Sequence, residues 1–324
     1  MRHLIDIAGT IEPDVAADAV RTRLAAGTFF WLDVEAPAED DFALLRDVIA
    51  LHPLAIEDAR NFGQRPKIED YDDFTTLIVF GAAPGDDDGP PRVEPVEVHV
   101  YYAERYLITV HHGRCPVFAA PRDQHARRLT QLEDAGTILY QVVDGLVDSF
   151  FPEMARFDEQ IDQLETAIFS NPTDEELQHV FAMKRALAAL RKIITPQRDA
   201  FAALVAGRYD LPGLDPAQAP YFRDVYDHLI RLSDELDTYR DLLGGAMDVY
   251  LSTVSNKLNV VMKQLGVVAS FFLPLSFLTG FFGQNFSWLA DRLTGPGTFL
   301  LLGLGSQIAA TVACFVYFRR RGWF

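Results

Sequence analysis

The sequence predicts an α/β domain followed by a long helical stalk and two C-terminal transmembrane helices. Three observations support this fold class. Runs rich in β-branched and aromatic residues occur in the first 125 residues, as in strands. The stretch from Tyr221 to Phe282 contains no proline except Pro274, so it can form one continuous helix. Two apolar segments near the C-terminus are each long enough to cross a bilayer.

The composition excludes several classes of protein. The chain has 324 residues, of which 49% are hydrophobic and 12% aromatic, which is not typical of a disordered protein. Two cysteines, Cys115 and Cys314, are too few for a disulfide scaffold or a thiolate zinc site. The net charge of −17 argues against sequence-independent nucleic-acid binding, which needs excess Lys and Arg. Cations are the natural partners of such a chain.

Residues 1–125 are expected to form the α/β domain, with a partly antiparallel sheet. Turn signals at Asp86 to Pro91 and at Ala103-Glu104 predict hairpins between strands. Short helical stretches are expected near residues 38–60. The predicted strands are residues 29–36, 74–82, 96–103 and 105–112.

Residues 126–220 are expected to form acidic helices in the same cytoplasmic body. One helix is predicted from near Ala126 to Phe169, where Ser170-Asn171-Pro172 ends it. The next helix begins at a capping box, because Thr173 is followed three residues later by Glu176. A linker rich in proline and glycine, residues 211–220, closes this region.

Residues 221–264 are predicted to be the stalk helix. Apolar side chains recur at alternating steps of four and three residues, which indicates a packing seam against other helices. The seam consists of Val225, Leu229, Leu232, Leu236, Tyr239, Leu243, Ala246 and Tyr250. On the opposite side, an acidic stripe recurs every seven residues and consists of Asp227, Asp234, Asp241 and Asp248. In one isolated helix the stripe is a solvated outer face, whereas around a shared axis it would form carboxylate rings that concentrate cations.

The two predicted membrane spans are residues 265–283 and 296–318, joined by an external loop, residues 284–295. Two buried helices of a soluble core are disfavoured, because five phenylalanines between Phe271 and Phe282 leave almost no polar face. Basic residues precede the first span, and the basic end 319–324 follows the second. The positive-inside rule therefore predicts a multi-pass protein of the plasma (inner) membrane with both termini in the cytoplasm.

Three segments carry a family resemblance. The run from Asn259 to Phe286 with the basic end RRRGWF, the stalk residues 221–259, and the segment from His52 to Phe74 together resemble the CorA family of magnesium channels. The resemblance covers most of the chain. It implies a homopentamer with a funnel-shaped cytoplasmic domain and a pore lined by the first membrane helix.

The resemblance also implies roles for residues of the first span and its end. The family signature at the outer mouth is Gly-Met-Asn, and this chain has Gly283, Gln284 and Asn285. Neutral amide oxygens at Asn285 suit a hydrated divalent cation, because Mg²⁺ sheds water reluctantly. By matching position, the pore-lining residues are Asn259, Met262, Leu265, Leu273 and Ser276.

A regulatory metal site is implied in the cytoplasmic part. Asp224 matches a family position that binds regulatory divalent ions between subunits, and its partner is expected among Asp86, Asp87 and Asp88. Carboxylates from different chains make an oxygen site for Mg²⁺ and repel one another without it. The competing interpretation of Asp86-Asp87-Asp88-Gly89 is an ordinary turn.

The function expected from the resemblance is Mg²⁺ influx down the electrochemical gradient, gated by cytoplasmic Mg²⁺, with Co²⁺ or Ni²⁺ as companion ions. The expected partners are further copies of the chain, membrane lipid and divalent cations, without an organic cofactor. An enzyme is not expected, since no phosphate-binding loop or GxSxG motif is present. Two alternatives are a Zn²⁺ transporter of the ZntB-like branch, coupled to protons, and an acidic membrane-bound sensor that does not conduct. A transition-metal site at His99, His111 and His112 is disfavoured, because strand histidines are more often structural.

Overall fold

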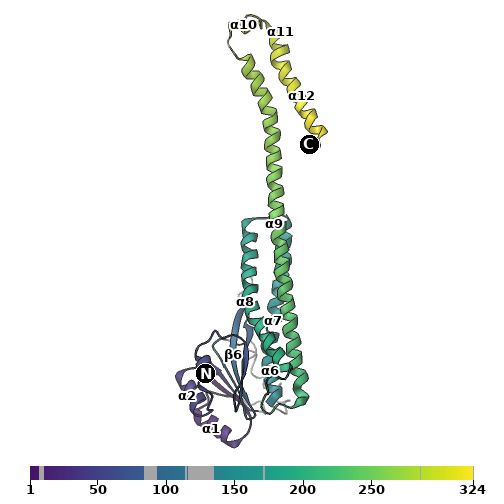
Figure 1. Cartoon of the computed structure of the whole chain (residues 1–324). Coiled ribbons are helices and arrows are strands. Elements are labelled where there is room, and N and C mark those ends of the chain that lie inside the picture. Colours follow the sequence, from purple (N-terminus) through teal and green to yellow (C-terminus); the bar gives the residue numbers. More distant parts are fainter. Residues whose placement is uncertain are drawn as a thin grey trace. The chain divides into compact units, whose positions relative to one another are not determined.

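The structure, a computed structural model, describes residues 1–6, 11–83, 93–113, 115, 135–170, 172–284 and 286–323. The chain forms two compact units, Met1–Asp248 and Val249–Phe324, and the long helix α9 contributes to both (Figure 1). Some predicted features lie outside the described residues. They are the turn at 86–91 with Asp86, Asp87 and Asp88, the start of the helix expected from Ala126, and Asn285.

The first unit contains a seven-stranded sheet with the order β2-β1-β3-β7-β6-β5-β4. Its strands are β1 (Arg2–Asp6), β2 (Ile11–Pro13), β3 (Phe30–Glu35), β4 (Lys67–Asp70), β5 (Thr75–Ala83), β6 (Glu94–Ala103) and β7 (Tyr106–His111). Strands β3 and β7 pair in parallel, and the other described pairs are antiparallel. The predicted α/β class with a partly antiparallel sheet is confirmed. The four predicted strands are β3, β5, β6 and β7, while β1, β2 and β4 were not predicted.

One face of the sheet packs against three short helices, α1 (Ala17–Ala26), α2 (Glu39–Asp47) and α3 (Pro53–Arg60). Alternating strand residues such as Phe30, Leu32 and Val34 contribute to this core, because successive strand side chains point to opposite faces. Val20 of α1 and Leu45 of α2 cover them and are fully buried. Helices α2 and α3 occupy the predicted helical stretch, whereas α1 was not predicted.

Helices α6 (Ala135–Asp148), α7 (Phe150–Ser170) and α8 (Asp174–Val205) contact the sheet through β5. Gly81 of β5 is required by this packing, because a Cβ there would lie 2.9 Å from Leu146 Cδ2 of α6. The capping box at the start of α8 is confirmed: the backbone N–H of Thr173 donates to Glu176 Oε2 at 2.8 Å.

The prediction of one helix up to Phe169 was wrong, because the helix breaks at Ser149 between α6 and α7. Pro152 explains the break, since it lacks the N–H that would bond the carbonyl of Asp148 four residues earlier. At this break the side chain of Ser149 contacts strand β5. Its Oγ accepts from the backbone N–H of Ala82 at 2.7 Å and donates to the carbonyl of Leu146 at 2.5 Å.

The edge of β5 beyond the last residue paired with β4 is covered by a helix side chain. Strand β4 pairs with β5 only from Thr75 to Ile78. At the next position on that edge, Gln197 of α8, which is fully buried, accepts from the backbone N–H of Phe80 at 2.7 Å and donates to its carbonyl at 3.3 Å. One amide side chain thus satisfies both backbone groups, which would otherwise be buried without partners.

Helix α9 (Ala219–Phe282) is the predicted continuous helix, and it follows a short 3₁₀ turn, η1 (Pro216–Gln218). All eight residues of the predicted seam are buried, which confirms the helix-packing interpretation of that pattern. All four residues of the acidic stripe are exposed. The part of α9 in the first unit therefore packs on one side and presents carboxylates on the other.

The second unit contains the remainder of α9 and the elements after it. They are α10 (Ser287–Ala290), α11 (Pro296–Thr298), a π-helical turn η2 (Phe299–Leu304) and α12 (Gly305–Arg320). Phe271 of α9 stacks on Phe318 of α12 with 6.0 Å between ring centroids, and Gln307 Nε2 donates to Thr279 Oγ1 at 3.3 Å. Both helices contain an apolar window long enough to cross a membrane, and neither window is buried within the unit.

Candidate divalent-cation sites

Three side chains of the first unit form a group that could hold a metal ion. Asp224 and His228 lie one turn apart on α9, and Asp144 lies on α6. One ligand atom from each residue lies within 4.8 Å of the others. The group forms because α6 packs beside α9 in the same unit, so that side chains 80 residues apart in sequence meet.

The ring nitrogens of His228 lie close to three carboxylates, but not all of these separations are hydrogen-bond distances. His228 Nδ1 lies 3.6 Å from Asp144 Oδ1 and 2.9 Å from an oxygen of Asp148, and His228 Nε2 lies 3.9 Å from Asp224 Oδ1. Tyr140 donates its hydroxyl to Asp224 Oδ2 at 3.3 Å. Asp144 Oδ1 and His228 Nδ1 are buried atoms, and neither makes a contact with hydrogen-bond geometry. The close approach of His228 Nδ1 to Asp148 is therefore an ion pair when the imidazole is protonated, rather than a well-directed hydrogen bond.

The electrostatics of this cluster favour a cation. Burial, followed by the negative charge of Asp148, raises the pKa of Asp144 to about 6. Burial and the neighbouring carboxylates also raise the pKa of Tyr140. A bound divalent cation would relieve the repulsion among these carboxylates. The carboxylate oxygens suit Mg²⁺, and the imidazole nitrogen adds a ligand that suits Co²⁺, Ni²⁺ or Zn²⁺.

The sequence singled out Asp224 but not the residues that surround it. The predicted partners Asp86, Asp87 and Asp88 lie outside the described residues. Asp144 and Asp148 were missed, although their spacing of four residues places them on one helix face, as it does Asp224 and His228. Two such pairs of ligand-type residues on predicted helices are the signal that could have found the cluster.

The structure does not bring His99 and His111 together, whereas His99 and His112 both contact the ring of Phe62, with 4.9 and 4.0 Å between ring centroids. His99 lies opposite Val110 and His111 lies opposite Val98, so the two imidazoles face opposite sides of the sheet. Each has a buried carboxylate partner: His99 Nε2 lies 2.7 Å from Glu97 Oε1, and His111 Nε2 lies 3.2 Å from Asp33 Oδ1. Burial lowers the pKa of His111, but the hydrogen bond and charge of Asp33 outweigh it and raise that pKa overall.

The predicted pore-lining residues lie on the second-unit part of α9. All are exposed in the single chain, and Met262, Leu265 and Leu273 are 67, 70 and 70% exposed. Apolar side chains this exposed need lipid or further protein around them. Helix α9 ends at Phe282, and the backbone N–H of Gly283 still donates to the carbonyl of Thr279 at 3.0 Å, so the predicted mouth residues Gly283 and Gln284 directly follow the helix.

Comparison with known proteins agrees over almost the whole chain. The profile of the family of CorA-like Mg²⁺ transporter proteins matches residues 26–320. The chain is 34% identical over 280 residues to the cobalt/magnesium transport protein CorA of Thermotoga maritima, covering 86% of this chain and 78% of that protein.

Two solved structures share the fold. The complete CorA magnesium transporter of Methanocaldococcus jannaschii superposes with a TM-score of 0.82 at 21% identity, covering 100% of this chain and 99% of that one. The cytoplasmic domain of ZntB from Vibrio parahaemolyticus superposes with a TM-score of 0.62 at 16% identity, covering 78% of this chain and 98% of that domain.

An α/β domain, a helix of 64 residues with an apolar C-terminal part, and one further apolar helix after it, together with these matches, define a membrane-integral transporter of divalent cations. The chain belongs to the CorA-like Mg²⁺ transporter family. Membership confirms the resemblance found in the sequence and the expectation that the protein is a transporter rather than an enzyme.

Proposed function

We propose that this chain is the subunit of a homopentameric channel of the plasma membrane that admits Mg²⁺, with Co²⁺ and Ni²⁺ as companion ions. The observation that carries the proposal is the relative from Thermotoga maritima, which is named as a cobalt/magnesium transport protein. The electrochemical gradient supplies the driving force, since a doubly charged ion gains about 4.6 kcal/mol per 100 mV. Both termini lie in the cytoplasm, as the positive-inside rule predicts.

The pore in this proposal is lined by the first span. Asn285 and Gln284 of several subunits collect the hydrated ion at the outer mouth with neutral amide oxygens. Rings of Met262 and Leu265 form an apolar throat further along α9, which closes by excluding water. The acidic stripe then faces the axis and concentrates cations on the cytoplasmic side.

Control by cytoplasmic Mg²⁺ is assigned to the cluster around Asp224. The carboxylates of Asp144, Asp148 and Asp224 repel one another unless a cation lies among them, so Mg²⁺ stabilises the arrangement in which α6 and α9 stay together. One or more of Asp86 to Asp88 completes the site from the neighbouring subunit. The transported ion thereby stabilises the closed state and limits its own entry.

Flux into liposomes tests the proposed transport. Purified full-length protein should take up Mg²⁺ when a negative internal voltage is imposed at equal pH on both sides. Uptake of Zn²⁺ that requires a pH gradient would instead support the zinc alternative, which the replacement of methionine by Gln284 in the signature keeps open. Absence of flux for either ion from a correctly assembled oligomer would contradict both and leave the sensor interpretation.

The regulatory assignment has a separate test with a matched control. Asp224→Asn removes a charge with little change in volume and should shift the internal Mg²⁺ concentration needed for half-inhibition upward by about tenfold, as expected for the loss of one charged ligand. Asp162→Asn makes the same change on the exposed side of α7 and should leave that concentration unchanged. Coincident inhibition curves for wild type and Asp224→Asn would remove Asp224 from the sensor.

A further inference from the structure

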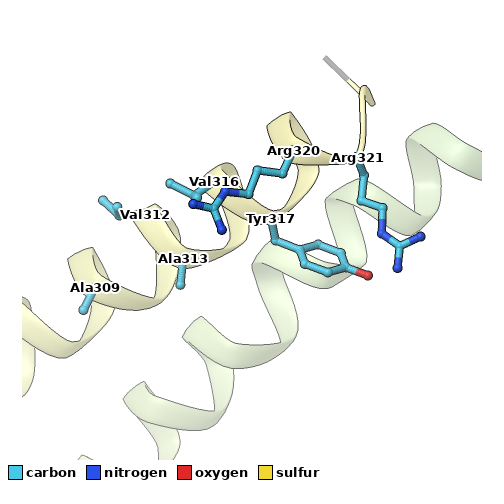
Figure 2. A pocket seen from close by; sticks show the side chains of 7 residues that line it. All are labelled: Ala309, Val312, Ala313, Val316, Tyr317, Arg320 and Arg321. Atoms are coloured by element: carbon cyan, nitrogen blue, oxygen red, sulfur yellow. The ribbon is translucent and has the colours of Figure 1, made fainter.

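Helix α12 carries a groove that ends at two arginines. The groove has a volume of about 750 Å³ and is lined by Ala309, Val312, Ala313, Val316, Tyr317, Arg320 and Arg321. Figure 2 shows the four small apolar side chains in a row along the helix, with the polar groups gathered at the C-terminal end. Arg320 folds back toward Val316, while Tyr317 and Arg321 extend toward the side of α9.

Among the residues that the structure describes, neither arginine of the groove has a carboxylate partner. Residues 249–324 contain one acidic residue, Asp291, which lies after α10 in the loop between the two spans. No ion pair to Arg320 or Arg321 occurs among the residues that the structure describes, and the guanidinium of Arg321 lies 5.8 Å from the ring centroid of Tyr317. The described residues of the unit therefore leave both guanidinium charges available to an anion.

The dimensions of the groove match one leaflet of a bilayer. From Ala309 to Arg320 the helix rises ~17 Å at 1.5 Å per residue, and half of a ~30 Å hydrocarbon core is ~15 Å. Apart from Tyr317, the lining beyond the arginines is apolar. A molecule that fits has an anionic group at one end and a hydrocarbon chain about one leaflet long at the other.

We propose that this groove binds an anionic phospholipid, with one acyl chain along Ala309 to Val316 and the phosphate at Arg320. Arg321 adds positive charge on the α9 side of the headgroup. The charge of the groove and its length both select this occupant. The cytoplasmic leaflet, where the basic end is expected, is the leaflet in which anionic lipids attract basic side chains. Tyr317 lies at the level of the headgroup, as aromatic residues with a polar end do.

Lipid retention by the full-length oligomer tests the proposal. Delipidated protein is incubated with vesicles of equal parts dioleoyl-phosphatidylcholine and dioleoyl-phosphatidylglycerol, repurified, and its bound lipids are counted by mass spectrometry. Wild type should enrich phosphatidylglycerol about 20- to 30-fold, as two arginines at about 1 kcal/mol each would give. Arg320→Gln combined with Arg321→Gln should reduce the enrichment about tenfold or more.

Matched variants separate this site from general attraction. Arg319→Gln removes the same charge from a neighbouring residue that does not line the groove and should lower the enrichment by less than Arg320→Gln does when measured alone. Ala313→Phe fills the groove without changing charge and should lower the total number of retained lipids. Unchanged enrichment in the double arginine variant, or unchanged retention in Ala313→Phe, would overturn the proposal.

Two further outcomes identify other occupants. Displacement of the lipid by soluble glycerophosphoglycerol at equal concentration would show that a free phosphate group suffices, and this would overturn the role of the acyl chain. Disulfide cross-linking between subunits through Ala313→Cys in membranes would show that a second copy covers the groove, and this would overturn the lipid assignment. The expected results are no displacement and no cross-link.

Discussion

The pair of Asp33 and His111 shows how individual side chains are held in position in the sheet. Asp33 accepts a hydrogen bond from Thr109 Oγ1 at 2.6 Å, and Thr109 accepts one from Trp31 Nε1 at 3.0 Å, so His111 faces a carboxylate that is already fixed in position. His111 also contacts the carbonyl of Gly113 at 2.8 Å. A protonated imidazole can donate to both groups at once, which is why the charged form is favoured despite its burial.

His111 should make stability depend on pH above 6.5. Its pKa is raised on folding, so the stabilisation is fully present below the unfolded value and is lost as pH rises through the folded pKa. His111→Gln should flatten the pH dependence of the unfolding temperature in that window, measured on full-length protein in detergent. His112→Gln, at an exposed neighbour, should keep the wild-type slope. Parallel slopes for wild type and His111→Gln would contradict this assignment.

The side chain of Asn285 is expected to be required for divalent-cation flux through the outer mouth of the proposed pore. Asn285→Ala removes the amide oxygens that receive the hydrated ion, so Mg²⁺ uptake into liposomes should fall at least tenfold in an oligomer that still elutes at the wild-type volume. Gln284→Met restores the residue usual in the family and should be tolerated, with a preference shifted toward Mg²⁺. Wild-type flux through Asn285→Ala would show that this residue only ends the helix.

At the scale of elements, α9 contains glycines that packing within the chain does not require. Gly244 and Gly245 are adjacent in this helix, and a Cβ added to either would meet no other atom within 4 Å. Glycine in a helix costs roughly 0.5–1 kcal/mol relative to alanine. The pair therefore weakens α9 locally without serving close packing, unlike Gly136 of α6, where a Cβ would lie 2.0 Å from Gln218 Oε1.

Alanine at these glycines should have opposite effects. Gly244→Ala with Gly245→Ala should raise the free energy of unfolding by about 1–2 kcal/mol, through helix propensity and a less flexible unfolded chain. Gly136→Ala should lower it, because the new methyl group would displace Gln218 and Leu214. Denaturant unfolding of the full-length protein measures both. A loss of stability in the double variant would show that the pair is needed for the fold.

Local patterns predicted elements well where one face is buried. The seam of α9 repeats over eight positions, so its period identified the helix and its buried side without knowledge of the partner. The apolar pattern does not predict the break at Ser149, because it continues across that residue. The local signal is Pro152, which lacks the N–H that would bond the carbonyl of Asp148. Strand β4 has only four residues and one clear apolar position, Ile68, so its sequence carried little signal.

The candidate metal cluster shows the limit of such patterns at the scale of the whole molecule. Asp224 was identified through the family resemblance, whereas Asp144 joins it only when α6 packs against α9, a contact across 80 residues that no local period reports. The pore-lining set has the same dependence, since exposed leucines along α9 acquire a role only when several chains surround one axis. The sequence therefore predicted which helices exist more reliably than which side chains meet.

The acidic stripe permits a test of the whole assembly. If Asp248 faces a central aqueous axis, Asp248→Asn should reduce conductance several-fold at ~0.01 M salt and little at ~1 M, where the Debye length is ~3 Å. Asp162→Asn, on the exposed side of α7, should leave conductance unchanged at both concentrations. Equal effects of salt on wild type and Asp248→Asn would show that the stripe faces outward.

Because Gln197 pairs with the edge of β5, this edge stays uncovered during synthesis until Gln197 has been made. Gln197 is 117 residues later in the chain than Phe80, so at 5–20 residues per second the ribosome needs roughly 6–23 seconds to deliver it. During that interval the backbone groups of Phe80 lie on an unpaired strand edge that other chains could extend. In Gln197→Ala the backbone groups of Phe80 would stay without this partner even after folding. The domain would then depend on cellular chaperones to avoid association through β5.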